Sequence, residues 1–493
     1  MNYIEGTSRH QLHLFQTNLD DIIPEDSPIR FLDTYVQKLN LEKLGFSIPE
    51  LRTGKPPYNP ELLLKIYIYG YLNRLRSSRK LERECKRNTE LIWLTESLAP
   101  DFKTIADFRK DNRDGIKKIF KEFLKLCQKL ELLSFQSVAI DGTKKRAQNS
   151  LGNIYKRSEL EKIEKRIQDK IDSYLRELDE NDSIEHDDFE LLSNNIVEKI
   201  KKLEKRKDKL DIVKKIFEEE KDLEVYFAND SDSRFQKDNG RTNAGYNCQS
   251  AVDEKNKLII TNDVTNENND LCQLNNMKDK ISDTKEELEV ECTTTLIADS
   301  GYHNEKEIMS AKEDEKFDLY VTHQRDAKTL EKQGREKKGK IPAKGYEKDD
   351  FVYCKEKDVF KCPEGKELHR RGKGSLKRGL RVYKYNCKDC SYCDKKHLCT
   401  ESKNGRSVEA SENMKEMMEF REKCNTAHGK AMLRKRKEIV EHPFGTIKGN
   451  WDYRYFMQSG MENVQSEFSF ITFIYNLRRV LNIVPLEKLL ESI

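Results

Sequence analysis

Three acidic residues far apart in the chain stand where metal-dependent chemistry could take place. Asp141 ends the apolar run VAID and Asp299 ends LIAD, and a glycine-containing turn follows each of them. Glu441 lies in the helical stretch RKRKEIVEHPFGTIK. Carboxylate oxygens suit Mg²⁺ and Mn²⁺, and a pair of such ions activates a hydroxyl and stabilises a leaving oxygen in phosphodiester reactions. The three acids therefore indicate a site for two divalent ions, although any one of them alone is more simply an exposed acid.

Cysteine spacing gives a second candidate metal site. Seven of the twelve cysteines are scattered singly and are most simply small apolar residues. The other five are clustered: Cys362, Cys387, Cys390, Cys393 and Cys399. Two residues between two cysteines let both sulfurs reach one Zn²⁺, so four of these five form a candidate structural zinc site. Free or redox-paired thiols are the alternative, because only one side of the cluster has compact spacing.

Basic residues gather in two places where they could neutralise DNA phosphates. One group lies in the loop that the cysteines enclose, and the other follows an apolar helix of the N-terminal region. The residues we assign to DNA contact are Arg74, Arg76, Arg79, Lys80, Arg83, Arg370, Arg371, Lys377 and Arg378. A solvated basic surface is the alternative at both places.

The elements that must position these residues alternate between helical and strand-like stretches. Residues 28–133 have the pattern of an all-α domain. Strand-like runs follow at 134–145, 244–253, 257–264 and 293–302, and a helical stretch at 270–287. After the first strand, leucines and isoleucines at three- or four-residue steps predict an antiparallel helical hairpin with DENDSIEHDD at its tip. This order predicts a mixed sheet with helices on its faces, as in a ribonuclease H-like core.

Composition limits the class of protein. A chain of 493 residues has room for several domains, but only 36% of them are hydrophobic and 37% are charged, so much of the chain must be solvated. The net charge of +4 provides no general attraction to DNA. No apolar run is long enough to span a bilayer, and the first residues lack the apolar stretch of a secretory signal. We therefore expect a cytoplasmic protein without a membrane partner.

Several segments resemble the corresponding blocks of bacterial insertion-sequence transposases of the DDE class. They are IDGTKKRAQNS, GYNCQSAVD, ADSGYHNEKEI and VEHPFGTIK, with further similarity in YNPELLLKIYIYGYLNR, KTIADFRK and the terminal YNLRR. The resemblance covers most of the chain. It implies that Asp141, Asp299 and Glu441 form an acidic triad that cuts and joins DNA with two Mg²⁺ or Mn²⁺ ions. It also implies that Lys448, two helical turns after Glu441, holds a DNA phosphate beside the metals.

The chain departs from the family signature at one position. Leu433 or Arg434 stands where the signature tyrosine is expected. Arg436 or Lys437 covers the signature arginine, and both are expected to contact DNA by this resemblance.

The resemblance also implies an organisation and a set of partners. We expect a multidomain α+β protein with an N-terminal helical DNA-binding domain (1–133), a ribonuclease H-like core in three parts (134–154, 227–323 and 413–493), a helical hairpin insertion (155–226) and a basic Cys-rich insertion (324–412). The expected partners are the terminal inverted repeats of a mobile element and target DNA, bound by a homodimer at the nucleoid. A metal-dependent nuclease without strand transfer and a non-catalytic, zinc-stabilised DNA-binding regulator remain alternatives.

Overall fold

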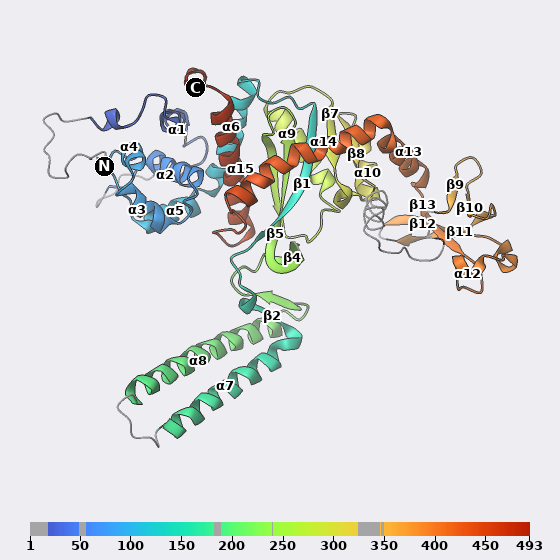
Figure 1. Ribbon diagram of the computed structural model, residues 1–493, viewed down its shortest axis with the longest axis horizontal. Coiled ribbons are helices and arrows are strands. Elements are labelled where there is room, and N and C mark those ends of the chain that lie inside the picture. Colours follow the sequence, from blue (N-terminus) through green and yellow to red (C-terminus); the bar gives the residue numbers. More distant parts are fainter. Residues whose placement is uncertain are drawn as a thin grey trace, which may run out of the picture.

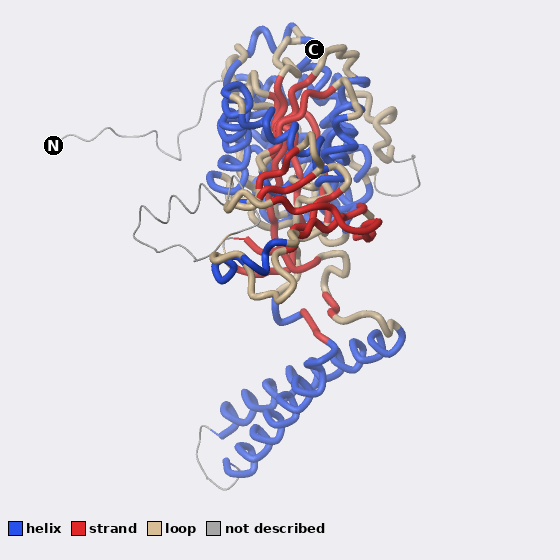
Figure 2. Tube along the Cα trace, turned by 90° about the vertical axis from the view of Figure 1, so that its right-hand side faces the viewer, coloured by secondary structure: helices blue, strands red, loops and turns tan. Residues whose placement is uncertain are grey.

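The computed structural model describes residues 18–48, 56–181, 189–238, 240–323, 346, 350–377 and 379–493. The molecule is elongated: the N-terminal helices lie at one end, a mixed sheet in the middle and a smaller sheet at the other end (Figure 1). A pair of long helices projects from this body, as the perpendicular view also shows (Figure 2).

The N-terminal region is helical, as the sequence predicts. It contains the 3₁₀ turn η1 (Leu19–Ile22) and the helices α1 (Pro28–Lys38), α2 (Pro60–Leu72), α3 (Ser78–Cys85), α4 (Thr89–Leu94), α5 (Phe102–Asp111) and α6 (Arg113–Lys129). The side chain of Asn88 caps α4 and that of Asp101 caps α5 by accepting bonds from free backbone amides. Helix α2 is buried nearly all round because α1, α4 and α5 pack against it, which explains its continuous apolar sequence.

The central sheet is mixed. Its strands are β1 (Ser137–Arg146), β4 (Arg234–Asp238), β5 (Arg241–Asp253), β6 (Ile259–Thr265), β7 (Thr294–Ala298) and β8 (Phe317–Val321). Strand β5 pairs antiparallel with β1 on one side and with β4 and β6 on the other. Strand β7 runs parallel to β1, and β8 parallel to β7. The expected multidomain α+β character with a mixed sheet is confirmed, whereas β4 and β8 were not predicted.

Helices cover the sheet and join it to the N-terminal region. They are α9 (Leu274–Glu287), α10 (Glu305–Lys312), α13 (Met414–Asn425), α14 (Ala427–Phe444), α15 (Met461–Ile483) and α16 (Leu486–Glu491), with the 3₁₀ turn η4 (Ser300–Tyr302) and the π-helical turn η7 (Gly445–Asn450). Helix α15 packs on both β6 and α6, and α14 packs on β1, β7 and β8. The buried Asn476 of α15 bonds the N–H and C=O of Ile259, which gives both backbone groups a partner at the start of edge strand β6. A single core thus spans the sheet and the N-terminal helices.

The projecting helices leave the sheet after β1. They are α7 (Leu160–Asn181) and α8 (Phe189–Glu219), and they pack along each other through Ile167, Ile171, Leu210 and Val213. Two short paired strands, β2 (Ile154–Lys156) and β3 (Val225–Phe227), tie their base, with the 3₁₀ turns η2 (Leu151–Asn153) and η3 (Arg157–Glu159) beside β2. The predicted hairpin therefore forms, and the segment DENDSIEHDD lies mainly outside the described residues.

The Cys-rich segment folds as an antiparallel sheet of its own. Its strands are β9 (Val352–Cys354), β10 (Val359–Lys361), β11 (Glu367–Lys377), β12 (Leu380–Asn386) and β13 (Ser407–Ser411), in the order β13-β12-β11-β10-β9. The 3₁₀ turn η6 (Asp389–Tyr392) and the short helix α12 (Lys396–Cys399) connect β12 to β13.

Among all the helices that the structure describes, none is long and apolar enough to cross a membrane.

Candidate active site

The pairing of β1 with β7 brings the two predicted aspartates together. Ala139 and Ile297 are parallel partners, and Asp141 and Asp299 each lie two residues further along the chain. Residues two apart share a face in extended backbone, and neighbouring strands are about 4.8 Å apart. The two aspartates therefore take adjacent positions on the same face at the carboxyl end of the parallel pair.

Each of these carboxylates has one oxygen held by the backbone and the other turned toward Arg436. Oδ1 of Asp141 accepts from the amide of Gly142 at 2.9 Å, and Oδ1 of Asp299 accepts from the amide of Gly301 at 2.7 Å. Oδ2 of Asp141 lies 3.1 Å from Nη1 of Arg436, and Oδ2 of Asp299 lies 3.9 Å from Nη2. The arginine comes from α14 and is largely buried. One cationic group thus bridges both carboxylates.

Asp141 and Asp299 together carry more negative charge than the single guanidinium of Arg436 balances. Burial raises the pKa of Asp141 to about 6; the charge of Arg436 lowers that pKa and the negative charge of Asp299 raises it again. The raised pKa means that burial makes the ionised form of Asp141 costly, and a bound cation would offset that cost. Carboxylate oxygens are also the ligand type that Mg²⁺ and Mn²⁺ take. The two aspartates fit a divalent cation in charge and in chemistry.

Asp270 is a third carboxylate beside the pair, and it was not predicted from the sequence. Its Oδ1 accepts from the buried amides of Asn247 and Gln249, both at 2.7 Å. Asp270 and Asp299 both lie against Gly301. A Cβ added to this glycine would lie 3.4 Å from Oδ2 of Asp270 and 2.9 Å from Oδ1 of Asp299. Asp270 follows the polar stretch NENN rather than an apolar strand, so a search for acids at strand ends passes over it.

Glu441 and Lys448 do not join the aspartates in this structure. Glu441 is exposed on α14, five residues and about 140° of helix rotation from Arg436. After Phe444 the α-helix becomes a π-helical turn, whose wider winding removes the alignment expected between Glu441 and Lys448. Lys448 instead lies 3.2 Å from Asp238 of β4. In the described part of the chain, no three His, Cys, Asp or Glu side chains are grouped to hold one metal ion.

One of the predicted N-terminal DNA contacts is a buried structural residue. Arg76 is only 8% exposed, donates to the carbonyl of Tyr455 at 2.8 Å and lies 3.6 Å from Glu467 of α15. Its guanidinium also covers the ring of Tyr453 at 4.3 Å. The expectation for Arg76 is therefore corrected, because this side chain joins the N-terminal region to the C-terminal helix and cannot reach DNA. The exposed members of the group are Arg74, Arg79, Lys80 and Arg83.

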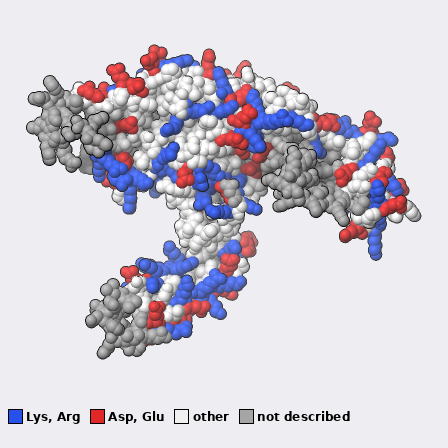
Figure 3. All heavy atoms as spheres, viewed as in Figure 1, with Lys and Arg blue, Asp and Glu red and all other residues white. Residues whose placement is uncertain are grey.

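The basic residues of the Cys-rich sheet are partly engaged with their neighbours. The guanidinium of Arg370 lies 3.3 Å from the ring centre of Tyr383, and Lys377 pairs with Glu409 at 2.7 Å. Acidic and basic side chains are interspersed over the face that Figure 3 shows, so any attraction to DNA there must be local. The remaining predicted contacts are Arg371 and Lys437, which are exposed, and Arg378, which lies outside the described residues.

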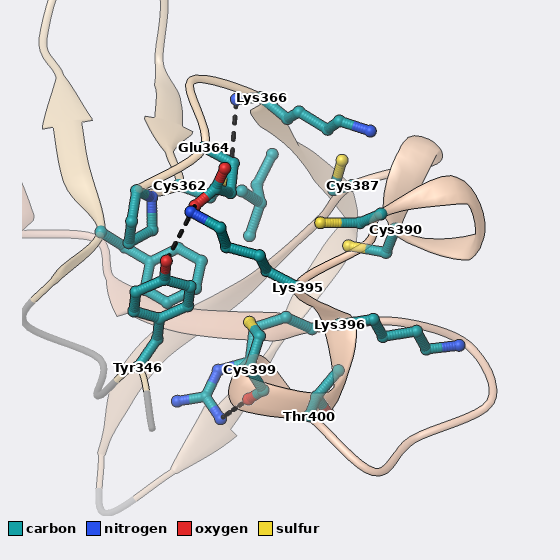
Figure 4. A pocket seen from close by; sticks show the side chains of 15 residues that line it. Tyr346, Cys362, Glu364, Lys366, Cys387, Cys390, Lys395, Lys396, Cys399 and Thr400 are labelled. Atoms are coloured by element: carbon teal, nitrogen blue, oxygen red, sulfur yellow. Dashed lines mark hydrogen bonds and ion pairs between the residues drawn. The ribbon is translucent and has the colours of Figure 1, made fainter. Parts of the chain in front are cut away.

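The five clustered cysteines line one small cavity. It measures about 20 Å³, room for roughly one water-sized sphere. Cys387 and Cys390 share a side-chain hydrogen bond, and Figure 4 shows their side chains next to each other, with Cys399 on α12. Burial raises the pKa of the Cys399 thiol, and negative charge on Cys390, Cys362 and Cys393 raises it further. The predicted cysteines therefore line one cavity, but among the described residues no three of their side chains are close enough together to hold one metal ion.

The bridging role of Arg436 predicts a measurable cost when its charge is removed. Arg436→Gln leaves two neighbouring carboxylates without their cation, so in a metal-free buffer the free energy of unfolding should fall by about 1–2 kcal/mol. Arg434→Gln, an exposed position on the same helix, should change it by less than about 0.5 kcal/mol. Urea denaturation checks both, and equal stability of the two variants would contradict the bridge.

Comparison with known families finds two segments of the chain that match transposase models. Residues 17–111 match a family model described as a transposase domain (DUF772), and residues 361–481 match one described as a transposase DDE domain. No curated protein and no solved structure matches the chain. The second match includes Glu441 and Lys448, whereas Asp141 and Asp299 lie between the two matched segments. A transposase domain and a DDE domain in one chain identify the protein as an insertion-sequence transposase of the DDE class, with DNA as its partner.

Proposed function

We propose that this transposase cleaves DNA at the ends of its element and transfers the new 3′ ends into target DNA at a site built around Asp141 and Asp299. The observation that carries the proposal is the convergence of both Oδ2 atoms on one cationic group, at 3.1 and 3.9 Å. Glu441 of the matched DDE domain is the proposed third acid. When bound, two divalent ions polarise the scissile phosphate and activate the attacking hydroxyl.

We infer that the central sheet is a ribonuclease H-like core. Three features support this: β5 is antiparallel to β1, β7 and β8 follow in parallel on the other side of β1, and the two aspartates lie just beyond the last paired residues of β1 and β7. On this proposal the α7–α8 hairpin and the Cys-rich sheet are insertions into the core. The proposed domain limits are those expected from the sequence.

In this proposal, Arg436 holds the site together until metal binds. Its guanidinium balances part of the charge of Asp141 and Asp299, and bound divalent ions would take over that role. The released arginine is then available for a DNA phosphate, the role that the family signature implies for it. To join the two aspartates, Glu441 would have to move from its exposed position on α14.

Strand transfer tests the proposal directly. Asp141→Asn, Asp299→Asn and Glu441→Gln should each lower the rate of joining labelled element ends to target DNA in Mg²⁺ by at least about a thousandfold, because metal activation is worth several kcal/mol. Asp452→Asn and Glu438→Gln are matched controls at exposed positions and should retain activity. Full activity of the Asp141 variant would refute the proposed site.

The same assay separates the alternatives. Cleaved ends without joined product would identify a nuclease that lacks strand transfer. Binding of element ends with neither product would favour a non-catalytic regulator. If Asp270→Asn is inactive while Glu441→Gln is active, Asp270 rather than Glu441 is the third acid.

We further propose that DNA lies along exposed basic residues of α3 and β11. Arg79, Lys80 and Arg83 form the exposed basic side of α3, whose buried side includes Leu81 and Cys85. A transposase brings two element ends together, so we propose that it acts as a homodimer on DNA.

We also propose that four of the five clustered cysteines hold a structural Zn²⁺. Their shared cavity supports this, and thiolates are the ligands that such a site needs; to hold one ion, the side chains would have to lie closer together than they do here. Purified protein should contain about one zinc per chain by elemental mass spectrometry. Cys390→Ser should lose most of it and Cys272→Ser, an exposed single cysteine, should keep it. Wild-type protein that is free of zinc after purification with zinc present would rule out the site.

A further inference from the structure

An open pocket of about 450 Å³ lies where three distant parts of the chain meet, away from the cysteine cavity. The loop after α2 contributes Arg74, the end of α14 contributes His442, and α15 contributes Arg478 and Arg479. Thr446 of the π-helical turn adds a hydroxyl. No carboxylate lines this pocket, so it gathers three guanidinium groups without an acid among them.

Two of these arginines are fixed by neutral partners, which leaves their charge unbalanced. Nη1 of Arg478 donates to the carbonyl of Leu72 at 3.2 Å, and Nε of Arg479 donates to the carbonyl of Asn256 at 2.5 Å. Within the described residues, no ion pair to a carboxylate involves Arg74, Arg478 or Arg479. Fixed donors with unbalanced positive charge are suited to an anion with several acceptor oxygens, such as a phosphate.

A chain of hydrogen bonds orients Arg479. The hydroxyl of Tyr475 donates to the carbonyl of Lys257 at 2.9 Å, so it accepts from Nδ1 of His442 at 2.8 Å. The other ring nitrogen of His442 must then accept, and Nη1 of Arg479 donates to it at 2.9 Å. The histidine is thus a neutral support that turns the guanidinium toward the pocket.

Arg74 occupies a backbone conformation that normally selects glycine. It follows α2 with φ +64°, its amide bonds the carbonyl of Tyr71, and the amide of Leu75 bonds that of Gly70. These two bonds form a Schellman motif, in which the left-handed position is usually glycine because a Cβ is unfavourable there. The same cap with a glutamate ends α6 and α9, so the conformation alone marks no site; here it fixes where the exposed Arg74 side chain leaves the helix end, at the lining of the pocket.

We propose that this pocket binds a backbone phosphate of DNA through Arg74, Arg478 and Arg479. DNA is already the partner of this protein, and the pocket lies at the end of α14, the helix whose Arg436 faces the two aspartates. The contact positions the duplex without reading its sequence, since phosphate carries no base information. It does not depend on which carboxylates bind metal.

Metal-free DNA binding tests this site separately from catalysis. Fluorescence anisotropy with a labelled random-sequence duplex in EDTA should show Arg479→Gln and Arg478→Gln each binding about tenfold more weakly near 0.1 M salt. The slope of log K against log salt should fall by about 0.9 for each lost phosphate contact. Arg176→Gln, an exposed arginine on α7, is the matched control. Affinities and slopes equal to those of this control would overturn the proposal.

A second variant keeps the test independent of folding. Arg74→Gly relieves the left-handed strain, so its melting temperature should equal or exceed that of wild type while its DNA affinity and salt slope fall. Unchanged DNA binding by this well-folded variant would also overturn the proposal.

Discussion

The parallel pairing of β1 with β7 is the constraint on which the site depends. It sets Asp141, within β1, beside Asp299, directly after β7, and like charges at such close range require a cation. Backbone amides of Gly142 and Gly301 hold one oxygen of each carboxylate, and Arg436 gathers the other two. The burial that keeps water from screening this pair also raises the pKa of Asp141. The register of β1 and β7 thus produces a site that attracts positive charge.

The rest of the fold stabilises the pairing of β1 with β7 and packs α14 against both strands. Helix α15 closes the edge of β6 through Asn476 and packs on α6, so the sheet and the N-terminal helices share one core. Arg76 adds a buried link between these parts, with Glu467 and two tyrosine rings around it. The α7–α8 hairpin follows β1 in the chain, and the Cys-rich sheet follows β8. Neither segment separates β1 from β7.

Local patterns in the sequence predicted several elements of the fold and of the candidate site. Apolar runs ending in an acid identified β1 and β7 with their aspartates, three- to four-residue periodicity identified the hairpin, and CxxC spacing identified cysteines that share a cavity. Such local patterns do not reveal contacts between residues that are distant in the chain. The burial of Arg76 depends on tyrosines nearly four hundred residues away, and the role of Asp270 depends on amides from β5. The π-helical turn, which displaces Lys448 from the face of Glu441, leaves no periodic signal.

Calorimetric titration with Mn²⁺ is the most direct test of the central claim that these two aspartates jointly bind divalent metal. The wild-type protein should bind Mn²⁺, and replacing either Asp141 or Asp299 by asparagine should weaken that binding at least tenfold, because each carboxylate supplies both charge and a ligand. An exposed Asp452→Asn control should bind as wild type does. Undiminished Mn²⁺ affinity in both site variants would contradict the account.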